Sequence, residues 1–158
     1  TIIASCDTGV SGAFAWIEAG KIRSIKMPHS INEINDIIIE LNRKGDLYFF
    51  IEKVNIRPSD QNNGRIFRLQ KMMQNYNEIV TVLKLLKIKY IEVMPRVWQQ
   101  GLNLAKVEEY ADRKRRNRKV AERYAGAKVT IQKADAVLIL VFGINKYKHQ
   151  PDWIAERL

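Results

Sequence analysis

The stretch "IIASCDTGVSGAFAW", residues 2–16, decides the fold because it holds two strands and the turn between them. Residues 2–6 have the composition of a strand interior, and the chain is apolar again after Gly12, so residues 8–11 are predicted to form a tight turn. Asp7 is left at the end of a buried strand, where carboxylates are rare unless they are paired or bind a metal. Asp7 is therefore either a turn-forming residue or a metal ligand.

The composition sets the class of protein. A chain of 158 residues that is 46% apolar is long enough to bury an ordinary core, and we expect one domain spanning residues 1–158. Cys6 is the one cysteine, so no intrachain disulfide is possible; we expect a small buried side chain and a reducing, cytoplasmic compartment. No run approaches the roughly 20 apolar residues of a membrane span, and no signal peptide is visible, so we expect no membrane partner.

The charge balance indicates the kind of partner. The chain carries 27 Lys and Arg against 17 Asp and Glu, a formal net charge of +10. Such a surplus on a small domain predicts a polyanionic partner, most often nucleic acid. A basic protein without such a partner is the alternative.

Hydrophobic spacing predicts the order of elements. Strands at 2–6, 12–18 and 21–27 form an antiparallel meander, with Ala19-Gly20 as its second turn. Ser30 and Glu33 form a capping box for a helix that ends before Gly45.

The second half alternates strands and helices. "LYFFIEKV" (47–54) is expected to be a strand covered on both faces, and "YIEVM" (90–94) a fifth strand. Between them a long helix runs from near residue 64 to 86, with its inner face formed by Ile66, Leu69, Met73, Tyr76, Val80 and Leu83. A loop is expected through Trp98 and Gly101, then a helix over 104–125 and a buried helix in "ADAVLILVF" (134–142). The order βββαβαβαα predicts an α/β domain with a mixed sheet.

Three carboxylates interrupt these apolar stretches. Asp7 ends the first strand, Glu52 lies late in the fourth, and Asp135 opens the last apolar run. If the first and fourth strands are neighbours, Asp7 and Glu52 lie side by side, and a helix packed across the strand ends adds Asp135. Three such groups raise one another's pKa values, and divalent cations such as Mg²⁺ or Mn²⁺ remove that penalty. The alternative is three separate roles: a turn residue, a helix N-cap at Asp135, and Glu52 paired with a lysine.

Taken together, these motifs resemble the RuvC-type Holliday junction resolvases, particularly phage-encoded ones. The resemblance rests on Asp7 with its "TGVSG" turn, on "FIEKV", on Pro95 to Trp98 as a P-x-x-W motif, and on the terminal "KADAVLIL". It implies a ribonuclease H-like fold with a mixed five-stranded sheet flanked by helices, and a homodimer in a bacterial or phage-infected cell. It also implies symmetric hydrolysis of four-way (Holliday) DNA junctions, with two Mg²⁺ ions per site that Mn²⁺ replaces. Asp7, Glu52 and Asp135 match three of the family's catalytic acids.

The chain departs from the family pattern in two places. The family usually has a fourth acid about one helical turn before the last aspartate, where this chain has Thr130, Ile131, Gln132 and Lys133. Gln132 is a neutral, weaker candidate ligand through its amide oxygen, and Asp152 or Glu156 are candidate replacements. The aromatic wedge that some resolvases carry after the strand acid is replaced by Asn55 and Ile56.

The sequence also predicts the DNA-binding surface. "DRKRRNRKVAERYAG" (112–126) carries a run of one sign, which favours phosphate binding through Arg113, Arg115, Arg116 and Arg118. The resemblance implies that one lysine here, Lys114 or Lys119, reaches the catalytic site. Tyr110, Ala111, Ala121 and Tyr124 are left to pack against the protein. Near Glu52, further DNA contacts are expected from Arg57, Asn62, Asn63 and Arg65. Phe67 is expected to pack in the core, with stacking on an unpaired base as the alternative, and Trp98 is expected to be a packing residue.

Two other functions remain open from sequence. The same fold could cut flaps, forks or RNA, or the missing fourth acid could mark a junction-binding protein without activity. The long helix, with Met72, Met73 and Tyr76, is the candidate dimer face or else core.

Overall fold

A mixed five-stranded sheet forms the centre of the protein, as expected. The computed structural model describes residues 1–54 and 65–158. The strands are β1 (Ile2–Asp7), β2 (Ala13–Glu18), β3 (Lys21–Lys26), β4 (Leu47–Glu52) and β5 (Lys89–Val93). Their order is β3-β2-β1-β4-β5, with β1 antiparallel to β2 and parallel to β4.

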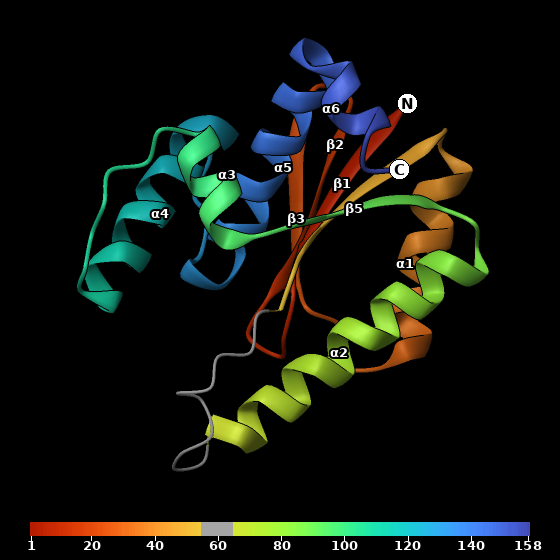
Figure 1. Ribbon diagram of the computed structural model, residues 1–158, viewed down its shortest axis with the longest axis horizontal. Helices are drawn as coiled ribbons and strands as arrows, with labels where there is room; N and C mark the ends of the chain where they lie inside the picture. The colour runs from red at the N-terminus through yellow and green to blue at the C-terminus, as the bar shows by residue number, and fades with distance from the viewer. Residues whose placement is uncertain (55–64) are drawn as a thin grey trace.

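Helices cover both faces of this sheet (Figure 1). One face packs on α1 (Ile31–Arg43) and α2 (Arg65–Leu85), and the other on α5 (Ile131–His149). The layer of α5 also contains α3 (Pro95–Gly101), α4 (Tyr110–Ala125) and α6 (Pro151–Ala155). Two apolar cores result, one on each face, so the central strands β1 and β4 are buried on both sides, whereas the edge strand β3 is partly exposed.

Local chemistry explains the turns and the first helix. Ala19 and Gly20 both have positive φ angles, as a tight hairpin turn requires. Gly9 has a φ of +109°, and its carbonyl accepts a hydrogen bond from the Gly12 amide, which closes the predicted turn after β1. The capping box at Ser30 and Glu33 is confirmed by reciprocal hydrogen bonds.

Helix α5 is buried along most of its length, which confirms the expected buried helix and extends it to nineteen residues. Gly143 allows this close packing, because a Cβ atom there would lie 2.6 Å from the Phe50 ring on β4. Ser5 on β1 also donates a 2.6 Å hydrogen bond to the Ala136 carbonyl. The start of α5 is thereby fixed against the strand that carries Asp7.

Two expectations about helices are wrong. Residues 95–101 form the short helix α3 instead of a loop, with Pro95 at its first position. The next helix begins at Tyr110, capped by the Glu109 side chain, so residues 104–109 are not helical.

The prediction for the inner face of α2 is also wrong in the first half of the helix. The buried residues are Asn75, Ile79, Val80, Val82 and Leu83, whereas Ile66 and Phe67 are exposed, Phe67 by 65%. The first turns of α2 extend beyond the end of the sheet, so none of the described strands lies beneath them (Figure 1). Met72, Met73 and Tyr76 are half-buried between these two regions.

In the described ranges, 1–54 and 65–158, no helix combines the length and the apolar character needed to cross a membrane.

Candidate active site

The sheet brings Asp7 and Glu52 to neighbouring strand ends. In the parallel pair of β1 and β4, Cys6 lies opposite Ile51, so the next residue of each strand is a carboxylate. Asp135 joins them from the second turn of α5, five residues after its N-cap Thr130. Asp135 is therefore not a helix N-cap, and its buried position faces the two strand acids.

All three carboxylates line one open cavity of about 820 Å³. The turn after β1 and the first turns of α2, α4 and α5 form its walls. The cavity is lined by Asp7, Thr8, Gly9, Val10, Ser11, Gly12, Glu52, Arg68, Lys71, Met72, Tyr110, Lys114, Ile131, Gln132 and Asp135. Carboxylates sit on its floor, and the basic side chains Arg68 and Lys71 are exposed at its mouth.

Asp135 is held by two donors from α4. The Lys114 ammonium lies 2.5 Å from Oδ2, and the Asn117 amide nitrogen donates to Oδ1 at 2.8 Å. The Asn117 oxygen in turn accepts hydrogen bonds from the Arg116 guanidinium. Both oxygens of Asp135 are thus fixed by groups one turn apart on the same helix.

Glu52 is held from the opposite side by Trp98 on α3. The indole Nε1–H of Trp98 donates to Glu52 Oε2 at 2.7 Å, and the tryptophan is 1% exposed. Trp98 packs in the core as expected, and it also makes a polar contact with a site residue. This contact replaces the lysine partner considered for Glu52.

Asp7 is held through its backbone. The Gly9 amide donates at 2.8 Å to the side chain of Asn75, a buried residue of α2. Thr8 is buried as well, and its hydroxyl lies 3.4 Å from the Glu52 carbonyl oxygen. The turn that follows Asp7 is therefore anchored both to α2 and to the end of β4.

The surroundings of Asp7 and Glu52 disfavour the ionised forms of these two carboxyl groups. Burial raises the pKa of Asp7 well above its ordinary value, and the charges of Glu52 and Asp135 raise it further, while Lys114 lowers it. Burial also raises the pKa of Glu52, to about 7, with the Trp98 hydrogen bond opposing the rise and Asp135 adding to it. Burial and the two strand acids raise the pKa of the Cys6 thiol, so this cysteine is inert.

Lys114 is the cation that the site itself provides. Burial alone would lower its pKa, but the charge and hydrogen bond of Asp135 raise it above the ordinary value. The side chain is therefore a permanent ammonium at neutral pH, in contact with the carboxylates. Lys119 is exposed and lies in a separate hollow with Arg115, Arg116 and Arg123, so Lys114 is the candidate that reaches the site.

A divalent cation fits the donor chemistry of this cavity. Three carboxylates that raise one another's pKa supply the hard oxygen ligands that Mg²⁺ and Mn²⁺ prefer. As the side chains stand, no three His, Cys, Asp or Glu residues of the described ranges converge closely enough to form a ready metal centre. Ion binding at Asp135 would require this carboxylate to share its oxygens with Lys114 or to release it.

Gln132 occupies the place of the missing fourth acid. It lines the cavity, and its amide nitrogen donates at 3.1 Å to the Gly12 carbonyl oxygen. A carboxylate could not make this contact, because both groups would be acceptors. Asp152 and Glu156 do not line the cavity: α6 lies near the start of β1, whereas Asp7 ends that strand (Figure 1).

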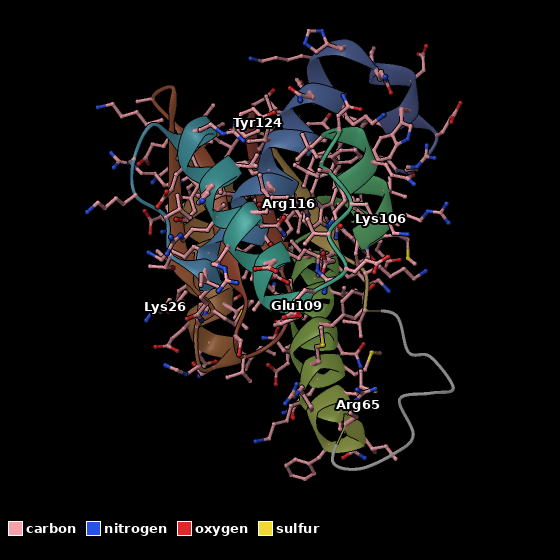
Figure 2. The ribbon with its side chains drawn as sticks, turned by 90° about the vertical axis from the view of Figure 1, so that its left-hand side faces the viewer. Lys26, Arg65, Lys106, Glu109, Arg116 and Tyr124 are labelled. Carbon is pink, nitrogen blue, oxygen red and sulfur yellow. The ribbon has the colours of Figure 1, made fainter. Side chains whose placement is uncertain are left out.

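The basic helix α4, whose Tyr110 and Lys114 line the cavity, faces the viewer in Figure 2. Figure 2 shows Arg116 near its middle, Tyr124 near its end and Glu109 at its start. Tyr110 and Tyr124 are 62% and 49% exposed, so the expectation that they pack inward is wrong; Asn117 and Ala121 are the buried residues. Arg115 is exposed and paired with Asp112, while Arg113, Arg116 and Arg118 are half-buried.

Of the DNA-contact candidates near Glu52 in the sequence, the structure describes Arg65, and this residue does not line the cavity. Arg65 is exposed at the first position of α2, at the far tip of that helix in Figure 2. Arg57, Asn62 and Asn63 lie outside the described residues, as do Asn55 and Ile56.

The sheet order and the helices on both of its faces define the class of this fold as ribonuclease H-like. Within that class the chain has a RuvC-type fold. RuvC of Thermus thermophilus in complex with a Holliday junction substrate is similar with a TM-score of 0.61 and 11% identity, over 95% of this chain and 96% of that chain. Thermus thermophilus RuvC in a second structure gives 0.60 and 12%, over 94% and 96%.

A third similar structure is the yeast mitochondrial Holliday junction resolvase Ydc2, with a TM-score of 0.48 and 11% identity, over 98% of this chain and 83% of that chain. The sequence matches no family model and no curated protein. The likeness to Thermus thermophilus RuvC confirms the fold expected from the motifs; membership of the phage-like branch stays a prediction.

Sequence reasoning missed three residues that hold the carboxylates: Trp98, Asn117 and Asn75. Asn117 was the one uncharged residue inside the run "RKRRNRK", a signal that this position faces inward. The P-x-x-W motif placed Trp98 near the end of β5, but not its partner. Asn75 carried no signal, because polar residues are ordinary on a long helix.

Proposed function

We propose that this chain is a metal-dependent endonuclease that resolves four-way DNA junctions. The observation that carries the proposal is the meeting of Asp7, Glu52 and Asp135 in one cavity, brought from two strands and a helix of a RuvC-type fold. The structure of a similar protein in complex with a Holliday junction substrate supports branched DNA as the ligand class. The net charge of +10 supports a polyanionic substrate independently of that likeness.

The metal would be held by the three carboxylates. Asp7 and Glu52 would bind one or both Mg²⁺ ions, Asp135 would complete the site, and Mn²⁺ would substitute. Two bound ions would activate the attacking water and stabilise the charge that develops on the phosphate and leaving oxygen. Gln132 would add at most a neutral ligand through its amide oxygen, while its amide nitrogen donates to the Gly12 carbonyl oxygen.

The protein's own residues would bind and orient the phosphate. Lys114 would donate to a phosphate oxygen at the cavity floor, and Arg68 and Lys71 would guide the backbone at its mouth. In the reaction a water oxygen bonds to the scissile phosphorus as the bond to the 3′ oxygen breaks. The water loses a proton and the leaving oxygen gains one, which gives 5′-phosphate and 3′-hydroxyl ends.

Symmetric cleavage requires two sites related by a two-fold axis, so we propose a homodimer. The exposed first half of α2, with Ile66 and Phe67, is the apolar surface that supports this arrangement. Light scattering coupled to gel filtration would give the mass of the particle in solution.

The test is cleavage of a labelled four-way junction in Mg²⁺ and in Mn²⁺, with Asp7→Asn alongside. Paired symmetric nicks that are lost in the variant would support resolution by this site. Flaps, forks and RNA hybrids run in parallel would separate a junction resolvase from a broader nuclease. Ca²⁺ gel shifts with the same substrates would measure binding without cleavage.

A junction-binding protein without activity is the second candidate, and the observation that favours it is the glutamine at position 132. Its signature would be tight junction binding with no nicking in either metal. That result would refute the enzyme proposal for this chain.

A further inference from the structure

The buried hydrogen bond between Trp98 and Glu52 joins the apolar core to the cavity. Trp98 does not line the cavity, whereas Glu52 does, so the carboxylate spans the boundary between the two. The indole Nε1–H donates at 2.7 Å to Oε2, the oxygen on the core side of that contact. An indole N–H is a neutral group that only donates, so its partner must be a carboxylate oxygen that accepts.

The surrounding elements fix the position of Trp98. Lys53, the residue after Glu52, donates its amide to the Val93 carbonyl at 2.9 Å, which ties the ends of β4 and β5 together. Helix α3 begins two residues after Val93, with Pro95 at its first position. Trp98 then enters the core beside α5 with 1% exposure, so tight packing surrounds the ring that donates to Glu52.

The three acids differ in how they are held. Asp135 is bound at both oxygens by α4, and Asp7 is positioned through its backbone turn. Glu52 has the longest side chain of the three, and its carboxylate accepts a hydrogen bond from Trp98. Without this contact the glutamate would be free to change rotamer within a cavity of about 820 Å³.

We propose that Trp98 is a positioning residue that fixes Glu52 Oε2 against the core and so leaves Oε1 directed to a divalent cation. This inference rests on the proposed function, because it assigns Glu52 as a ligand. Groups that orient metal ligands from behind typically change metal affinity or activity by about 10- to 100-fold when removed. Trp98→Phe keeps an aromatic ring in the core and removes the donor.

The experiment compares the full-length wild-type chain with Trp98→Phe and with Trp153→Phe as the matched control. Trp153 is also an aromatic residue of this layer, stacked edge-on against Phe142. We expect Trp98→Phe to raise the Mn²⁺ concentration for half-maximal junction cleavage by at least tenfold, with junction affinity in Ca²⁺ unchanged. Trp153→Phe should leave both quantities as in the wild type.

A second readout needs no activity. In ¹H–¹⁵N spectra, the indole signal assigned to Trp98 should be the one that moves in Glu52→Gln, and the one that sub-stoichiometric Mn²⁺ broadens first. Trp16 and Trp153 serve as internal references in the same spectrum. This measurement keeps the inference testable if Trp98→Phe fails to fold.

The outcomes separate the two proposals. If the wild type and Trp98→Phe nick junctions with the same Mn²⁺ concentration for half-maximal cleavage, the role of Trp98 is overturned and the proposed function is not. Equal broadening of the three indole signals by Mn²⁺ would overturn it as well. A wild-type chain that neither binds Mn²⁺ nor nicks junctions would refute the proposed function, and this inference with it.

Discussion

Neutralising Glu52 should stabilise the metal-free protein while abolishing its proposed activity. Burial raises the pKa of Glu52 from 4.5 to about 7, against the opposing Trp98 hydrogen bond. At about 1.4 kcal/mol per pH unit, this rise corresponds to roughly 3 kcal/mol of unfavourable free energy once the group is ionised. Glu52→Gln removes the charge and keeps an oxygen that can accept from Trp98.

The effect has a defined pH window. Below about pH 4.5 the carboxyl is protonated in both the folded and the unfolded chain, so its ionisation costs no stability. Between pH 4.5 and 7 the folded state keeps the proton that the unfolded chain has released, and the free energy of unfolding falls as pH rises. Above pH 7 the loss is complete, so the advantage of Glu52→Gln should grow from near zero at pH 4 to about 3 kcal/mol at pH 8.

Urea unfolding in EDTA across this pH range is the assay, with the exposed Glu108→Gln as control. The control should follow the wild type at every pH. Adding Mg²⁺ should stabilise the wild type and narrow its gap to Glu52→Gln, because a ligand that binds the folded state raises the free energy of unfolding. A Glu52→Gln protein that is no more stable than the wild type at pH 8 would refute the electrostatic reasoning.

Three further variants test the packing around the site. Lys114→Met removes the ammonium that contacts Asp135 and should lower the free energy of unfolding at pH 8 by about 3 kcal/mol, since it leaves a buried charge unpaired; an unchanged urea midpoint would contradict this. Asn117→Leu removes the second contact to Asp135 and should slow junction cleavage by about tenfold or more with Ca²⁺-supported binding unchanged; cleavage at the wild-type rate would argue against it. Gly143→Ala places a Cβ atom 2.6 Å from the Phe50 ring and should cost about 1–3 kcal/mol, seen as a Tm at least about 2 °C lower, so an equal or higher Tm would exclude tight packing there.

The elements that the sequence predicted well are those whose signal is local. Apolar stretches separated by Gly-containing turns predicted the meander, and the S-x-x-E capping box predicted the start of α1. The short helix α3 was missed because its proline start and terminal glycine are also typical of a loop. The exposed half of α2 was misassigned because helical spacing continues past the end of the sheet, where none of the described strands lies beneath the helix (Figure 1).

The site follows the same division between local and long-range signals. Asp7, Glu52 and Asp135 were found because each is a carboxylate in an apolar stretch, which one sequence window reveals. Their partners depend on which helices pack across the strand ends, and no window contains both members of such a pair. Trp98 lies 46 residues from Glu52, and Asn117 lies 18 from Asp135.

Burial of the carboxylates makes the site visible in the sequence, and the same burial makes their ionisation unfavourable in the folded protein. A carboxylate at the end of a buried strand is conspicuous because water is excluded there, and the same exclusion raises the pKa values of Asp7 and Glu52. The protein opposes this cost in part, with one ammonium from Lys114 and with the neutral donors of Trp98 and Asn117. Among the described residues, three carboxylates face one adjacent ammonium, which leaves a deficit of positive charge at high pH, since Arg68 and Lys71 at the mouth are exposed and screened by water. Such a deficit in a basic chain supports the proposed cation, and it is why the stability of the metal-free protein and its proposed activity should respond to Glu52→Gln in opposite directions.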